Sequence, residues 1–120
     1  MTEGLARTNV VGNLLKILTV FEAGSHRDLV HGWCEALAPQ SRVIDVASAT
    51  DAVLTLLGEP VDMLLIDAAV AGDLLTSLRR HAQRSAPQAR LVIFHDDAPR
   101  AGLLPWSQLG PTLQRLLRAA

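Results

Sequence analysis

Short runs of apolar residues alternate along the chain with longer segments in which apolar residues recur every three or four positions. The runs cover residues 16–21, 42–46, 62–66 and 90–94. Each is too short for a typical helix, and continuous aliphatic and β-branched residues predict strands that are covered on both faces of a parallel sheet. The run at residues 62–66 (DMLLI) is the most continuous, which predicts that it is a central strand.

The segments between the runs have the periodicity of amphipathic helices. Ser25 with Asp28 three residues later predicts a capping box at the start of the first helix. Gly58 closes the second helix, and a final helix is expected from Pro111 to about Ala119. The apolar stripes expected on these helices are Leu29, Val30, Trp33, Cys34 and Leu37, then Ala52, Val53, Leu56 and Leu57, then Leu74, Leu75, Leu78 and Ala82, and finally Leu113, Leu116 and Leu117.

One connection departs from this alternation of strands and helices. Only residues 95–102 (HDDAPRAG) separate the fourth run from Leu103, where we expect a fifth strand to begin. A parallel crossover that contains a helix needs about a dozen residues or more, and Pro99 and Gly102 favour a loop. We therefore predict that the helix before the fifth strand is missing or replaced by a loop.

Loss of that helix is expected to uncover an apolar face beside the fourth strand. Either Leu91 and Ile93 or Val92 and Phe94 are then partly bare. A bare apolar face favours contact with a partner, so we predict that this region binds a protein partner or a second copy of the chain. The residues assigned to this contact are Leu91, Ile93, Leu103, Leu104, Trp106 and Leu109.

Composition narrows the class of protein. The 120 residues, of which 49% are hydrophobic, suffice for the core of one domain. The 11 basic and 12 acidic residues nearly cancel, so direct binding to nucleic acid is not expected. Cys34 is the only cysteine, which fits a reducing compartment, and the sequence shows no signal peptide or membrane-spanning apolar run. We therefore expect a cytoplasmic protein without a membrane partner.

Polar residues follow several of the predicted strands. In a parallel sheet, ligands bind beyond the carboxyl ends of the strands, where Glu22, Asp67 and His95 are expected. Asp67 follows the central strand and needs a cation, a backbone N–H or a proton, so it is either a phosphoacceptor or metal ligand or a cap for nearby N–H groups. Glu22 either assists Mg²⁺ or is an exposed loop acid. For His95, Asp96 and Asp97, a solvated turn is favoured over a metal site.

The stretch from Asp51 to Arg80 (DAVLTLLGEPVDMLLIDAAVAGDLLTSLRR) resembles the middle of a response-regulator receiver domain. In that family an apolar strand ends in the phosphorylated aspartate, and the resemblance places Asp67 at this position. It implies a flavodoxin-like (CheY-like) three-layer α/β sandwich with a parallel five-stranded sheet in the order 2-1-3-4-5. The receiver-like domain is then expected over residues 16–120, after a lead segment of residues 1–15.

The resemblance is incomplete at the residues that support phosphoryl transfer. Receivers carry an acidic pair after the first strand, a hydroxyl residue after the fourth and a lysine before a proline after the fifth. In this sequence Phe21 and Glu22 occupy the acidic pair, His95 replaces the hydroxyl residue, and Leu104 replaces the lysine. Each lost charged partner of a developing anion costs on the order of 3 kcal/mol in the barrier.

We therefore interpret the chain as an atypical receiver domain of bacterial signal transduction or transcription regulation. It is expected not to be an enzyme, to need no cofactor, and to act by self-association or by controlling an effector domain in a longer chain. Receiver-like domains without the helix before the fifth strand precede some flagellar regulators among the bacterial enhancer-binding activators, and atypical receivers precede pilus-assembly ATPases. One alternative is a functional phosphoreceiver that uses Asp67 and Glu22 with Mg²⁺; a small α/β enzyme that uses His95 with Asp67 is a third, less favoured hypothesis.

Overall fold

The computed structural model describes residues 14–96 and 102–119 and contains a parallel four-stranded sheet. The strands are β1 (Lys16–Val20), β2 (Arg42–Val46), β3 (Met63–Asp67) and β4 (Arg90–Phe94), in the order β2-β1-β3-β4. Each strand coincides within one residue with a predicted apolar run. Because all neighbouring pairs are parallel, the carboxyl ends of the strands meet at one edge of the sheet.

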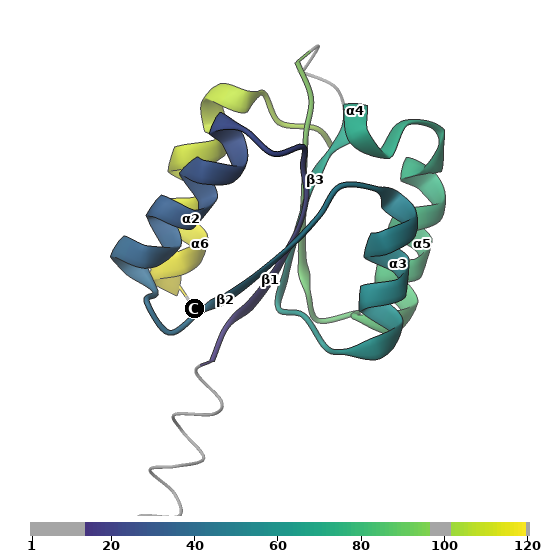
Figure 1. Ribbon diagram of the computed structural model, residues 1–120, viewed down its shortest axis with the longest axis horizontal. Helices are drawn as coiled ribbons and strands as arrows, with labels where there is room; N and C mark the ends of the chain where they lie inside the picture. The colour runs from purple at the N-terminus through teal and green to yellow at the C-terminus, as the bar shows by residue number, and fades with distance from the viewer. Residues whose placement is uncertain (1–13, 97–101, 120) are drawn as a thin grey trace, which may run out of the picture.

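Helices cover both faces of the sheet and complete three layers (Figure 1). The helices α2 (Ser25–Leu37) and α6 (Leu109–Ala119) lie on one face, and α3 (Ala49–Gly58) and α5 (Leu75–Ser85) on the other. The short elements are α4 (Ala68–Ala71) and the 3₁₀ turns η1 (Gly72–Leu74) and η2 (Trp106–Gln108). No helix in the described ranges is long and apolar enough to span a bilayer. The predicted α/β sandwich is confirmed.

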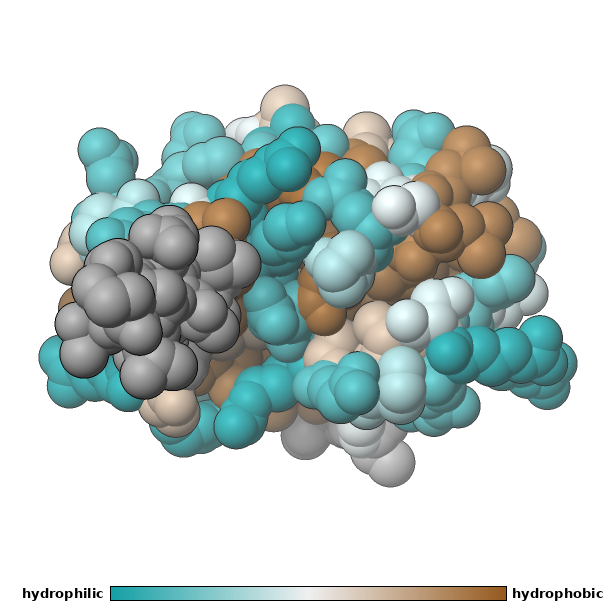
Figure 2. All heavy atoms as spheres, turned by 90° about the horizontal axis from the view of Figure 1, so that it is seen from below, coloured by the Kyte–Doolittle hydropathy of each residue, from teal (hydrophilic) through white to brown (hydrophobic). Residues whose placement is uncertain are grey.

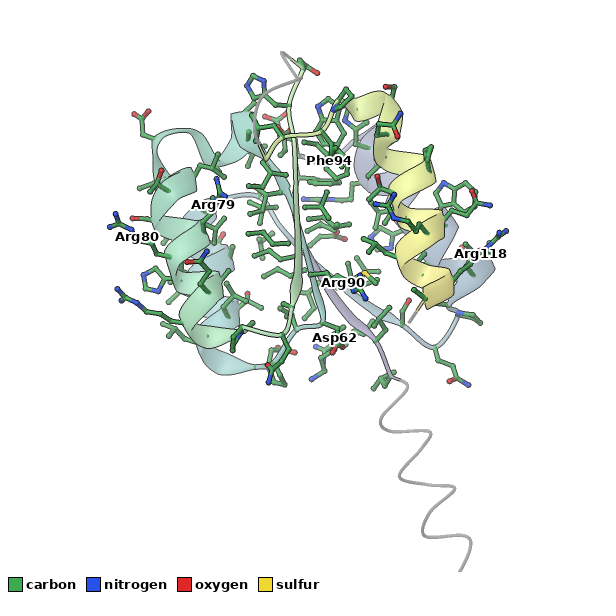
Figure 3. All side chains as sticks on the ribbon, turned by 180° about the vertical axis from the view of Figure 1, so that it is seen from behind. Asp62, Arg79, Arg80, Arg90, Phe94 and Arg118 are labelled. Atoms are coloured by element: carbon green, nitrogen blue, oxygen red, sulfur yellow. The ribbon has the colours of Figure 1, made fainter. Side chains whose placement is uncertain are left out.

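The central strand β3 is buried on both faces, as its continuous apolar sequence predicts. Leu64 and Ile66 belong to the core under α3 and α5, whereas Met63 and Leu65 belong to the core under α2 and α6. This division follows from the alternation of side chains along a strand. The side chains of the sheet therefore fill the two spaces between the layers (Figure 3).

The starts of the first two helices differ from each other. Ser48 caps α3, since its hydroxyl oxygen accepts a hydrogen bond of 3.1 Å from the Asp51 N–H. The capping box predicted at Ser25 is wrong: Ser25 is the first residue of α2 and makes no capping bond with its side chain. Gly24 takes the cap position instead, and its carbonyl accepts the N–H of Asp28 at 3.0 Å.

The prediction of a five-stranded sheet is corrected to four strands and one isolated bridge. Leu104 pairs in parallel with Phe94: its N–H donates to the Ile93 carbonyl at 2.8 Å, and its carbonyl accepts the His95 N–H at 3.0 Å. Pro105 follows at once, and proline has no N–H with which to continue a ladder. The segment therefore ends before it becomes a strand.

Two sequence predictions fall mainly outside the described residues. The predicted lead segment includes residues 1–13, and the predicted helix-free connection includes residues 97–101, neither of which the structure describes. Both statements remain predictions.

Truncation of Leu65 tests the burial of the face of β3 that lies under α2 and α6. We expect Leu65→Ala to lower the free energy of unfolding by about 2–5 kcal/mol, because the side chain is fully buried and its removal leaves a cavity. The matched variant Leu29→Ala, at an exposed position on α2, is expected to change it by less than about 1 kcal/mol. Urea denaturation followed by circular dichroism measures both, and equal losses would contradict the proposed core.

Candidate functional site

Acidic residues from three strand ends come together at the carboxyl edge of the sheet. Asp67 is the last residue of β3, Glu22 follows β1, and Asp96 follows β4. Their charges interact, since both Asp96 and Glu22 contribute to the altered pKa of Asp67. The sequence prediction that Glu22 and Asp67 lie at a common edge is confirmed in position. His95 lies at the same edge and is joined through its backbone to Leu104.

Asp67 is a partly buried carboxyl group that caps the following helix. One of its oxygens, Oδ1, accepts a hydrogen bond of 2.9 Å from the Ala69 N–H at the start of α4. Burial raises the pKa of Asp67 above its ordinary value, hydrogen bonds from the Ala69 and Val70 amides oppose the rise, and the negative charges of Asp96 and Glu22 add to it. The predicted capping of backbone N–H groups is therefore observed, and the role of phosphoacceptor stays a prediction.

A small polar hollow opens beside Asp67. Its volume is about 190 Å³, and it lies between the end of β3 and the loop that leads from β1 into α2. The residues that line it are Phe21, Glu22, Ala23, Gly24, Ser25, His26 and Asp67.

An aromatic cluster adjoins this hollow. Trp106 is stacked between His26, at 3.7 Å between ring centroids and 4° between planes, and Phe94, at 5.0 Å and 16°. Phe21 meets Trp106 edge to face at 5.2 Å. Phe94 is the register partner of Asp67 in the sheet and points from β4 toward α6 (Figure 3). Three of the four Phe and Trp residues of the chain therefore pack beside the acidic edge.

Sequence reasoning missed this cluster. Trp106 was expected among the residues that contact a partner. Phe21 and Phe94 were visible as the last apolar residues of two runs, and this was the only available signal. The stack joins segments 80 residues apart (106 − 26), and no local pattern encodes such a contact.

No lysine is available at the acidic edge. Lys16 is the only lysine in the sequence and lies at the start of β1, where its ammonium group is 3.6 Å from Glu59. Its backbone N–H donates to the Asp62 carboxylate at 2.8 Å, and Asp62 precedes Asp67 by five residues of strand, or roughly 16 Å. Leu104, at the position where receivers carry lysine, packs in the core under α2 and α6.

The side chains at the acidic edge do not supply a set of ligands for a magnesium ion. Among the described residues, no group of three His, Cys, Asp or Glu side chains is placed to hold a metal ion. Phe21, at the position of one acidic ligand, is buried in the core and offers no side-chain oxygen. The carboxylates of Glu22, Asp67 and Asp96 lie at this edge but are not placed to hold an ion together, and Asp67 already accepts a backbone hydrogen bond. Mg²⁺ prefers oxygen ligands in octahedral geometry and would need most of them from water here.

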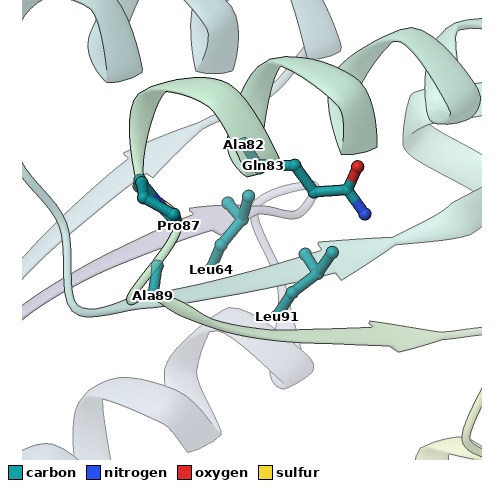
Figure 4. A pocket seen from close by; sticks show the side chains of 7 residues that line it. Leu64, Ala82, Gln83, Pro87, Ala89 and Leu91 are labelled. Atoms are coloured by element: carbon teal, nitrogen blue, oxygen red, sulfur yellow. The ribbon is translucent and has the colours of Figure 1, made fainter.

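The predicted partner-contact residues are divided between surface and core. Ile93 and Leu109 are only 3% and 1% exposed, so the domain itself buries them. Leu91, Leu103, Leu104 and Trp106 are half-buried. Leu91 lines a pocket of about 180 Å³ under the C-terminal end of α5, together with Leu64, Ala82, Gln83, Ala86, Pro87 and Ala89 (Figure 4).

Exposure changes along β4 rather than between its two faces. Leu91 and Val92 are half-buried although they lie on opposite faces, whereas Ile93 and Phe94 are buried. The expectation of one bare face is corrected, because the bridge at Leu104 covers only the C-terminal end of the strand.

A second polar cluster, also missed from the sequence, holds α2 to the sheet. The Asp45 carboxylate accepts a hydrogen bond of 2.5 Å from the buried Thr19 hydroxyl and lies 2.6 Å from His31 Nε2. Arg27 Nε is 3.7 Å from the same carboxylate, and an Arg27 guanidinium nitrogen donates to the Phe21 carbonyl at 2.6 Å. These contacts fix the start of α2, and with it His26, above the acidic edge.

The arrangement of the elements is the receiver fold of response regulators. The likeness extends to the response regulator RcsB of Salmonella typhimurium, at a TM-score of 0.70 and 14% identity over 89% of this chain. This chain spans 59% of that RcsB chain, whose structure was studied for conformational dynamism in DNA interaction.

Two further structures match nearly their whole length. A response regulator of Thermotoga maritima matches at a TM-score of 0.65 and 16% identity, over 88% of this chain and 98% of its own. The receiver domain of the sensor histidine kinase PA1611 of Pseudomonas aeruginosa, which has magnesium coordinated in its active-site cleft, matches at 0.65 and 18% over the same shares. No protein-family model and no curated protein matches the sequence. The likeness therefore lies in the fold.

Substitution of Trp106 tests the contribution of the aromatic cluster. We expect Trp106→Ala to lower the free energy of unfolding by about 2–4 kcal/mol, because two stacked contacts and one edge contact are lost. Trp106→Phe retains a ring between His26 and Phe94 and is expected to cost about half as much or less. Denaturant unfolding measures both variants, and a loss below about 0.5 kcal/mol for Trp106→Ala would show that the stack does not support the fold.

The pH dependence of stability tests the environment of Asp67. Its raised pKa means that the folded state binds the Asp67 proton more tightly than the unfolded chain does. The free energy of unfolding therefore falls as the pH rises from the pKa of Asp67 in the unfolded chain through its higher pKa in the folded state. Asp67→Asn keeps an oxygen for the Ala69 N–H without the charge, and we expect it to be more stable than the parent at neutral pH. The difference in the free energy of unfolding between Asp67→Asn and the parent should shrink below about pH 4, because Asp67 is then protonated in both the folded and the unfolded state.

The matched control for this prediction is Asp73→Asn, which removes the same charge from an exposed position. Thermal unfolding measured from acid to neutral pH compares the variants. A gain of equal size in both variants, or a loss in Asp67→Asn at neutral pH, would contradict a raised pKa at Asp67.

Proposed function

We propose that this chain is an atypical receiver domain that regulates a partner by protein–protein contact, without efficient phosphorylation of Asp67. The observation that carries the proposal is the aromatic cluster of Phe21, Phe94, Trp106 and His26, which packs beside Asp67. The receiver fold supports a signalling role, since receiver domains are generally signalling modules rather than enzymes.

Phosphoryl transfer depends on cations that neutralise the charge of the transferred group. Lys16, the only lysine, lies at the opposite edge of the sheet, and Phe21 supplies a buried ring in place of a carboxylate. These two features act in the same direction, so we propose that the unphosphorylated form is the working form.

The proposed partner is a protein: a second copy of the chain or an effector domain in a longer bacterial regulator. The half-buried residues Leu91, near the start of β4, and Leu103, Leu104 and Trp106, near its carboxyl end, provide apolar contact area and remain our candidates for contact with an effector. The net charge of −1 does not favour direct nucleic-acid binding. We also propose a cytoplasmic location, because a chain whose only cysteine is Cys34 fits a reducing compartment.

The alternative function is a phosphoreceiver that accepts a phosphoryl group on Asp67 with the help of Glu22 and Mg²⁺. The position of Asp67 at the end of β3 favours it, as does the magnesium ion held in the cleft of the kinase receiver domain with the same fold. The alternative requires two carboxylates and water to hold the ion.

Beryllofluoride, a mimic of a carboxylate-bound phosphoryl group, separates the two functions. We expect the full chain titrated with beryllofluoride and Mg²⁺ to show no saturable change at the Ala69 and Val70 amides, which donate to Asp67. Heteronuclear NMR of the backbone amides measures this. The Asp67→Asn variant serves as the control, because it cannot form the adduct.

A saturable shift of these amides in the parent chain that is absent in Asp67→Asn would overturn the proposal and establish the phosphoreceiver. Equal small shifts in both proteins would be salt effects and would leave the parent without an adduct at Asp67, as proposed.

A further inference from the structure

The face formed by α3 and α5 carries large apolar side chains in contact with solvent. Leu54 and Leu57 on α3 are 61% and 66% exposed, and Leu74 beside α5 is 49% exposed. Leu57 and Leu74 were expected on the buried stripes of their helices. Figure 2 shows a hydrophobic patch on the side of the molecule that these two helices form. Exposed leucines that cluster in this way mark an interaction surface more often than isolated ones do.

Leu54 and Leu74 line a groove between the two helices. The groove has a volume of about 190 Å³, and its lining is mainly apolar, including Val53, Leu54, Leu74 and Leu78, with His81 at one end. The helices pack against each other, so the groove is a fixed feature of the surface. It lies across the sheet from the aromatic cluster and shares no residue with the hollow beside Asp67.

The two helices carry opposite charge. Asp51 is the charged residue of α3, which has no basic residue, whereas α5 carries Arg79, Arg80 and Arg84 and no acid. Among the described residues, Asp51, Arg80 and Arg84 have no ion-pair partner. Arg80 points away from the sheet, into solvent (Figure 3). An apolar centre with unpaired charges of opposite sign on its two sides is complementary to itself.

We propose that this face binds a second copy of the chain, with α3 of each copy lying against α5 of the other. Both helices follow strands of a parallel sheet, so they run in the same direction. A two-fold axis parallel to the helices then places the Asp51 of each copy opposite the basic helix of the other, and the exposed leucines of α3 meet the groove of the facing copy. A two-fold axis perpendicular to the helices would instead set α5 against α5 and bring Arg80 against its own copy.

The dimer proposed here gives the proposed regulatory function a defined partner surface, but it does not require any particular state of Asp67. A domain that self-associates through α3 and α5 leaves the half-buried residues Leu91, Leu103 and Trp106 available for a different contact. A result that excludes the dimer would therefore say nothing about phosphorylation of Asp67. In the same way, the result of the beryllofluoride experiment would say nothing about the dimer.

Sedimentation velocity of the full chain from micromolar to millimolar concentration tests the proposal. We expect a reversible monomer–dimer equilibrium whose dissociation constant rises at least roughly tenfold in the Leu54→Glu/Leu57→Glu variant, since two central apolar contacts become charged. Leu29→Glu, an exposed leucine on α2, is the matched control and should leave the constant unchanged. Circular dichroism verifies that each variant is folded, as expected for exposed positions.

A charge exchange tests the arrangement of the two copies. We expect Asp51→Arg and Arg80→Glu each to weaken the dimer, and the double variant Asp51→Arg/Arg80→Glu to restore it, because every facing pair is then opposite in charge again. A chain that stays monomeric at all concentrations, or a dimer that is unchanged by Leu54→Glu/Leu57→Glu, would overturn the proposed surface. If Leu54→Glu/Leu57→Glu weakens the dimer but the double variant Asp51→Arg/Arg80→Glu does not restore it, the surface stands and the proposed packing of α3 against α5 of the other copy is overturned.

Discussion

Burial of β3 on both faces is the constraint on which the rest of this structure depends. Its side chains alternate between two cores, so a pair of helices is needed on each side of the sheet. A strand in this position cannot carry a polar side chain until it reaches the edge of the sheet, and Asp67 stands at that point. The same constraint places Asp67 beside Glu22 and Asp96, because parallel neighbours end at the same edge.

At the acidic edge, Asp67 occupies a position suited to phosphoryl chemistry, but the residues around it are ones that pack in the core. In place of a second carboxylate and a lysine, Phe21 and Leu104 add to the core under α2 and α6. Trp106 then closes this core at its upper end by stacking between His26 and Phe94. Rings that are held by three segments of the chain stabilise the fold, and the same rings leave a metal ion or a transferred phosphoryl group few partners.

The two sides of the sheet accordingly offer different kinds of surface. On the side of α2 and α6, the polar contacts of Asp45 with Thr19, His31 and Arg27 fix the first helix against the strands. On the side of α3 and α5, leucines remain exposed along a groove whose two walls differ in charge. The proposed contact with an effector and the proposed self-association would therefore use separate faces of one small domain.

The sequence by itself determined the four strands, the pairs of helices and the place of Asp67, because apolar runs and helical stripes report local burial directly. It did not show that Pro105 reduces the fifth strand to a bridge at Leu104, since the length of a strand depends on the partner beside it. It placed Leu57 in a buried stripe, although the width of a stripe depends on how closely the neighbouring helix packs. The Trp106 stack was decided by tertiary structure alone, because the rings that form it meet only after distant segments have packed together.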